Sequence, residues 1–130
     1  MLPQYFAQNA DSKHPIYSTE LGIYTPHCGL SNVKMSWGHD EYLYQVCVRN
    51  GCTLPAEGLA AIRFHSFYPW HNKGAYSHLT NEHDERMLEF VLKFNAHDLY
   101  SKSQPKQDVQ KLKPYYQSLI AKYFPEKLKW

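Results

Sequence analysis

Apolar residues recur at helical spacing through most of the chain beyond residue 37. The first periodic segment, residues 39–48, places Tyr42, Leu43 and Val46 on one face, which is the pattern of an amphipathic helix. Gly51 follows closely, and glycine is typical of the left-handed residue that ends a helix. The pattern therefore predicts a first helix whose apolar side is formed by these three residues.

A second helix is predicted between Thr53 and Pro69. Thr53 is a suitable N-cap and Pro55 is tolerated in a first turn, whereas Pro69 lacks the amide proton that would continue the helix. A turn around Gly74 separates this helix from the next one. The side that we expect the second helix to bury combines apolar residues with one histidine: Leu59, Ala61, Ile62 and His65.

The third periodic segment carries the clearest helix signals. Thr80 or Asn81 can cap it, and the acidic residues of its first turn suit the positive end of a helix dipole. We expect this helix to run to about Tyr100. A fourth helix is predicted to open at Asp108 and to close at Pro125.

Residues 1 to about 37 follow neither the helical nor the strand period and are rich in Pro, Gly, Asn, Ser and Thr. They read as a long loop with apolar anchors, a kind of segment that usually leans on a partner or serves a function. No run of four to eight residues alternates as a strand does. The sequence therefore predicts an all-α chain, with residues 1–37 mostly loop and 38–130 helical within one partial domain.

Composition and charge narrow the classes of partner. A formal charge of +2 is too small to indicate nucleic acid or an anionic membrane. No apolar run is long enough to span a bilayer, and the opening residues lack the apolar core of a signal peptide. Cys28, Cys47 and Cys52 are an odd number without paired spacing, so neither a disulfide framework nor a zinc site is predicted. We expect a cytoplasmic protein; the sequence does not indicate an oligomeric state.

One carboxylate continues an apolar stripe on the third helix. Met87, Val91 and Phe94 are followed at the same helical spacing by Asp98. An unpaired buried carboxylate costs several kcal/mol, so Asp98 requires a cation, a metal or strong donors. From the stripe alone, a core partner and a metal are equally good explanations.

Two histidines repeat this pattern on the other helices. His65 lies one turn beyond Ala61 and Ile62, and His39 lies in the first turn of the first helix. Taken singly, each is better explained as a structural histidine. Three residues of metal-ligand type on three consecutive helices favour a shared site, and histidine with carboxylate suits iron, manganese or zinc.

Rival sites are weaker. A hydrolase triad of Ser66, His65 and Asp98 is disfavoured because adjacent residues on one helix cannot easily make the nucleophile–base contact, and no G-x-S-x-G turn exists. Asp40 is expected to serve the start of the first helix rather than to chelate with His39. The remaining candidate histidines are expected to be solvated: His71, His78, His83 and His97.

Five long stretches of the sequence resemble those of the myo-inositol oxygenase family. They are "YSTELGIYTPHCGL", "MSWGHDEYLYQV", "IRFHSFYPWH", "DERMLEFVLKFNAHDLYSK" and "LKPYYQSLIAKYFP". The likeness covers residues 17–130, and its motifs are long and rich in aromatic residues. It resembles the C-terminal half of the family pattern.

The resemblance implies a helical bundle of the HD-domain type with a di-iron centre. Members of this family use O₂ to cleave the ring of myo-inositol to D-glucuronate. By resemblance, His39, His65 and Asp98 match iron ligands, while His65, Ser66 and Lys102 match positions at the substrate. Iron, O₂ and myo-inositol are then the expected cofactor and substrates.

The resemblance also implies ligands that have no counterpart here, namely a further histidine and an adjacent His-Asp pair from an N-terminal half. We therefore expect this chain to carry about half of the site and to be inactive alone. The alternative is a non-catalytic helical remnant or interaction fragment with weak metal binding. A phosphohydrolase function, by analogy with other HD-domain proteins, rests on fold alone.

Overall fold

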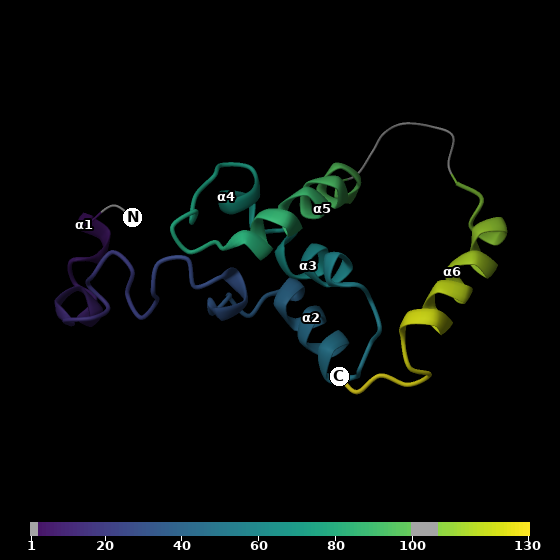
Figure 1. Cartoon of the computed structure of the whole chain (residues 1–130). Coiled ribbons are helices and arrows are strands. Elements are labelled where there is room, and N and C mark those ends of the chain that lie inside the picture. Colours follow the sequence, from purple (N-terminus) through teal and green to yellow (C-terminus); the bar gives the residue numbers. More distant parts are fainter. Residues whose placement is uncertain (1–2, 100–106) are drawn as a thin grey trace.

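The structure is a computed structural model that describes residues 3–99 and 107–130 (Figure 1). Within these ranges the chain forms six α-helices and two 3₁₀ turns and no strand, which confirms the all-α prediction. The longer helices are α2 (His39–Arg49), α3 (Ala56–Phe64), α5 (Glu82–Asp98) and α6 (Val109–Tyr123). The short elements are α1 (Pro3–Phe6), η1 (Ala10–Lys13), η2 (Leu30–Asn32) and α4 (Tyr68–His71).

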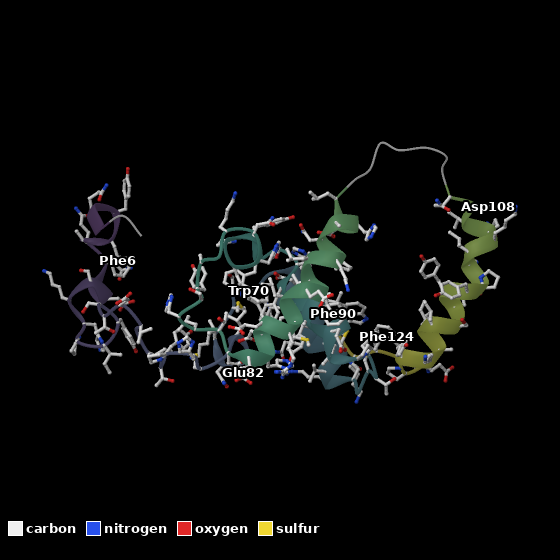
Figure 2. All side chains as sticks on the ribbon, turned by 45° about the horizontal axis from the view of Figure 1, so that its top comes forward. Phe6, Trp70, Glu82, Phe90, Asp108 and Phe124 are labelled. Carbon is white, nitrogen blue, oxygen red and sulfur yellow. The ribbon has the colours of Figure 1, made fainter. Side chains whose placement is uncertain are left out.

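The core lies where α3 packs between α2 and α5, with α4 against α5 (Figure 1). Its buried apolar residues come from four separate segments, and Figure 2 shows Trp70 among their crowded side chains. They are Leu30, Ala60, Phe64, Trp70, Met87 and Val91. Because α3 supplies contacts to both neighbours, residues at its ends are held in fixed positions relative to α2 and α5.

The loop before α2 is hydrogen-bonded to the segment that begins α5. The backbone amides of His27 and Gly29 donate to the carbonyls of His78 and Leu79, both at 2.8 Å. Leu30, which is fully buried, donates its amide to Asp84 at 2.9 Å. Leu30 is thus an apolar residue of this loop that reaches the core, and the segment before α2 also contains the short elements α1, η1 and η2.

The C-terminal segment is attached through the turn that follows α2. The amide of Thr53 donates to the Tyr123 carbonyl at 2.8 Å, and the Asn50 side chain bonds both the amide and the carbonyl of Lys129. Helix α6 otherwise stands apart from α2, α3 and α5 (Figure 1). None of its residues is buried against the described part of the chain.

Several helix boundaries follow local signals and are confirmed. Asn81 caps α5 in a reciprocal capping box with Asp84, and Asp108 caps α6 by accepting from the Gln110 amide at 3.1 Å. The predicted extension of α5 to Tyr100 falls outside the described residues. The second helix differs, because Pro55 rather than Thr53 is its N-cap and it ends at Phe64.

The predicted apolar face of the first helix is wrong in part. Tyr42 and Leu43 are 37% and 39% exposed, and the buried residues of α2 are Glu41, Val46 and Cys47. The reason is a buried ion pair between Glu41 and Arg63 of α3, which turns the polar Glu41 inward. Pro69 also behaves differently from the expectation, since it lies in the first turn of α4 and starts a helix there. In the described ranges no helix is long and apolar enough to cross a membrane.

Candidate metal centre

Two of the predicted metal ligands face each other across the α2–α3 interface. His39 is the first residue of α2, and His65 is the C-cap of α3. Their Nε2 atoms are 3.0 Å apart, and the two rings meet at 68°. The contact arises because the N-terminus of α2 and the C-terminus of α3 lie side by side.

The orientation of His65 is set by its second ring nitrogen. Nδ1 donates to the Ile62 carbonyl at 2.9 Å, a bond that leaves the lone pair on Nε2. A backbone acceptor on one imidazole nitrogen is the usual device that fixes the tautomer of a metal-binding histidine. The Phe94 ring of α5 packs against the His65 ring at 5.7 Å between centroids.

His71 holds the same residue from behind. Its Nε2 donates to the His65 carbonyl at 2.9 Å, and the side chain is buried. The expectation that His71 is solvated is therefore wrong. The turn between Phe64 and Tyr68 reverses the chain and folds His71 back beneath His65, a contact that local spacing does not reveal.

The histidine pair fits a first-row transition metal. Two nitrogen ligands at about 2.1 Å from one metal and at a right angle to each other lie about 3 Å apart, which matches the distance between the two Nε2 atoms. His39 is exposed and His65 is half-buried, so further coordination positions face outward. Imidazole ligands suit iron, zinc and copper alike, so the geometry of the pair is compatible with a metal but does not select one.

A polar pair lies directly beside the histidines. The Ser66 hydroxyl donates to Oδ2 of Asp40, and Oδ1 of Asp40 accepts from the Glu41 amide at 2.9 Å. Partial burial acts to raise the pKa of Asp40, but these hydrogen bonds and the nearby His39 hold the pKa below its usual value. Asp40 is therefore a carboxylate near neutral pH. It serves the start of α2, as expected, and it also fixes the Ser66 hydroxyl.

These residues border a half-open cavity of about 370 Å³. His39, Asp40 and Ser66 line it together with the polar residues Lys34, Ser36 and Arg63, and apolar residues of the loop before α2 and of the segment around α4 complete the lining. Its volume lies within the range of small-molecule sites. Of the histidine pair, His39 lines this cavity, which has room for a small polar molecule beside it.

Behind the site, Arg63 and Glu41 tie α2 to α3. Their Nε and Oε2 atoms are 2.6 Å apart with side chains that are 9% and 7% exposed, and Gln45 donates to Glu41 at 2.7 Å. The Arg63 guanidinium also lies 4.6 Å from the centre of the Tyr44 ring. This buried network fixes the two helices that carry the histidines.

The third predicted metal ligand, Asp98, is not joined to the pair. Asp98 is exposed at the end of α5, and Phe94 before it is 42% exposed. The expected burial of Asp98 is wrong, because this residue ends α5 beyond the contacts of Phe94 and Asn95 with His65 and Tyr68. Across residues 3–99 and 107–130, no three His, Cys, Asp or Glu side chains gather as a metal-binding group. Lys102 lies outside the described residues.

Two residues of the site, Asp40 and His71, were not predicted. Asp40 follows His39 directly, and adjacency in sequence argued against a shared role because neighbours on a helix point in different directions. The two side chains do point in different directions: Asp40 bonds Ser66, while His39 contacts His65. The signal that could have revealed it is a short polar residue beside each histidine, in "HD" and "HS".

The fold and the histidine pair define an all-helical protein with a candidate metal centre at a polar cavity. The model of the myo-inositol oxygenase family matches residues 1–130, so the chain belongs to this family. It is 59% identical over 127 residues to an inositol oxygenase of Dictyostelium discoideum, which covers 98% of this chain and 44% of that protein. An inositol oxygenase of Danio rerio is 61% identical over 125 residues, covering 96% and 45% respectively. The chain thus spans less than half the length of these relatives.

Proposed function

We propose that this chain is part of an inositol oxygenase, an iron enzyme that uses O₂ to cleave the ring of myo-inositol to D-glucuronate. The observation that carries the proposal is the convergence of the His39 and His65 Nε2 atoms at 3.0 Å in a chain of this family. When bound, iron would supply open positions for a sugar diol and for O₂, and histidine and carboxylate ligands tolerate its change of oxidation state. We further propose an HD-domain-like arrangement for the complete bundle.

The residues beside the histidines suit a polyol. Since the Ser66 proton is donated to Asp40, the lone pairs of the Ser66 oxygen remain free to accept from a hydroxyl group of myo-inositol. Asp40 has a lowered pKa and keeps this proton arrangement across neutral pH. In this proposal His39, His65 and Asp98 hold iron, and His65, Ser66 and Lys102 border the substrate.

The chain alone is proposed to be inactive. It spans 44% and 45% of two relatives, and in its described ranges only a pair of candidate ligands converges, with no third member. Two ligands cannot hold two irons. This observation favours a second candidate for the isolated chain, a non-catalytic helical segment that binds one metal weakly.

A chimeric enzyme tests the proposal. In it, this chain replaces the matching 125 residues of the Danio rerio relative, the protein is loaded with Fe²⁺ without oxygen, and D-glucuronate is measured after myo-inositol and O₂ are added. We expect turnover by the chimera and none by the 130-residue chain. His65→Ala in the chimera is expected to lower turnover at least about 100-fold, because removing an iron ligand should cost at least as much as removing a hydrogen-bonding partner of a ligand, which typically costs about 10–100-fold.

The matched control is His83→Ala, which removes an exposed histidine at the start of α5. It should leave both iron content and turnover unchanged. A folded, iron-loaded chimera that releases no D-glucuronate contradicts the proposed function. Turnover by the isolated chain would instead overturn the proposal that it is inactive.

A further inference from the structure

Helix α2 ends in a turn that brings two cysteines together. Gly51 adopts the left-handed conformation with φ of 67°. Its amide donates to the Val48 carbonyl at 3.1 Å, and the Cys52 amide donates to the Cys47 carbonyl at 3.0 Å. This pair of bonds is the Schellman motif, which brings the side chain of the residue two past the cap against a residue in the last turn of the helix. Those two positions are usually apolar, and here both are cysteines.

The two thiols interact in the folded chain. Cys47 is 1% exposed and Cys52 is half-buried. Burial raises the pKa of the Cys47 thiol, and the neighbouring Cys52 thiol raises it further. Cys28 belongs to a different region, where its Sγ lies 3.7 Å from the Gly29 carbonyl oxygen near the start of α5. The fold therefore pairs Cys47 with Cys52 and separates both from Cys28.

The same turn is the attachment point of the C-terminal segment. Asn50 bonds Lys129, and Thr53 bonds the end of α6. A covalent bond between Cys47 and Cys52 would close the turn around Gly51 while leaving these groups in place. Such a bond would also keep α2 from fraying at this end.

We propose that Cys47 and Cys52 are a redox modification site, which a small-molecule disulfide such as oxidised glutathione converts to an intramolecular disulfide. The half-buried Cys52 thiolate attacks one sulfur of the oxidant, forming a mixed disulfide and releasing the first small thiol. Cys47 then loses its proton and attacks the Cys52 sulfur, and the second small thiol leaves. Two protein thiols are oxidised to one disulfide, and one small disulfide is reduced to two thiols. This site is independent of the proposed oxygenase function.

The test is the thiol–disulfide equilibrium of the full 130-residue chain with glutathione. The chain is equilibrated with mixtures of reduced and oxidised glutathione, once under native conditions and once in concentrated guanidinium chloride. After acid quenching, peptide mass mapping measures how much Cys47–Cys52 disulfide has formed. We expect the equilibrium constant to be at least about 10-fold larger in the native chain, because folding holds the two thiols together.

Matched variants complete the experiment. Cys28→Ser should leave the native equilibrium constant unchanged, and Cys52→Ser should leave Cys47 as a free thiol. The proposal is overturned if the native and denatured constants are equal, or if the native one is smaller. It is also overturned if oxidation stops at a glutathione adduct on Cys52, or if disulfides to Cys28 dominate.

Discussion

At the level of single residues, the site depends on histidine rings that form hydrogen bonds with backbone carbonyls as well as with other side chains. His65 uses Nδ1 on its own helix and receives a bond from His71 at its carbonyl oxygen. In the described part of the chain, Nδ1 of His71 is buried without a hydrogen-bond partner. Burying a nitrogen without a hydrogen-bond partner lowers the stability of the folded state. The other ring nitrogen of His71 nevertheless holds the His65 backbone in position.

Cys47 gives a pH dependence of stability at this scale. Its pKa is raised by burial and by Cys52, so the folded chain retains a proton that the unfolded chain releases near pH 8.5. The stabilising contribution is complete below the unfolded pKa and is lost as the pH rises through the folded pKa. Under reducing conditions, we expect the free energy of unfolding to fall between about pH 8 and 10. Urea titrations at several pH values measure this free energy of unfolding.

The control for this prediction is Cys47→Ala, which lacks the titrating thiol. Other groups titrate in the same range, so the informative quantity is the difference between the two slopes. The variant should lose less stability with rising pH than the parent chain. Equal slopes would show that Cys47 ionises alike in the folded and unfolded states.

At the scale of elements, the pairing of α2 with α3 decides where the histidines meet. The buried Arg63–Glu41 bridge joins the last turn of α3 to the first turn of α2, and the cation–π contact of Arg63 with Tyr44 extends this join one turn along α2. Because both helices are rigid, this join also sets the distance between the start of α2 and the end of α3. The ion pair therefore supports the site from behind without touching the histidines.

Arg63→Met tests this support. The change leaves the Glu41 carboxylate buried without its cation, which destabilises a protein by about 3 kcal/mol. We expect that loss in urea unfolding. The matched control is Lys93→Met, which removes the exposed pair with Glu89 and should not shift the unfolding midpoint. A loss of less than about 1 kcal/mol for Arg63→Met would mean that the bridge behaves as a surface pair.

Alanine substitutions at two glycines separate the effect of a left-handed backbone conformation from the effect of helix propensity. Gly51→Ala forces a Cβ into the left-handed conformation and is expected to destabilise the chain by about 1 kcal/mol. Gly58 lies inside α3, where a Cβ would come no closer than 3.8 Å to Pro55. Gly58→Ala should therefore stabilise by about 0.5 kcal/mol or more. Thermal unfolding measures both, and shifts of the same sign would contradict this account.

The sequence predicted where helices begin better than it predicted which of their faces are buried. Asn81 and Asp108 lie next to the amides that they cap, so their helix starts could be read locally. The inward turn of Glu41 and the exposure of Tyr42 depend on Arg63, 22 residues away. The pairing of Asp40 with Ser66 and of Cys47 with Cys52 likewise follows from tertiary contacts or turn geometry, which no periodicity encodes.

Across the whole molecule, buried apolar contacts are unevenly distributed. Leu30 and helices α3, α4 and α5 share a core on which α2 packs through α3, while α6 lies apart (Figure 1). Large apolar side chains of α6 are exposed. Val109, Tyr115 and Ile120 are 70%, 59% and 57% exposed. The chain also spans less than half of the relatives it matches. Within the described ranges, the apolar burial that stabilises the fold is concentrated in the core formed by η2, α3, α4 and α5.

Hydrogen exchange tests this division. Amides of α3 and α5 are expected to exchange only through unfolding of the core, because their helices bury most of the apolar residues. Amides of α6 should exchange at least about 100-fold faster, because local opening there exposes little additional apolar surface. Mass spectrometry of peptides from both regions measures the two rates. Equal protection of α6 and α5 would show that α6 is part of the core unit.

The most direct test of the central claim is a histidine NMR spectrum of the 130-residue chain during anaerobic titration with Fe²⁺. The chain has eight histidines, and we expect the imidazole signals of His39 and His65 to broaden or shift first, at one equivalent of metal. Exposed histidines such as His83 should respond only at excess metal. Signals of His39 and His65 that stay unchanged, or broadening that begins at the exposed histidines, would contradict the claim that this pair forms the metal centre.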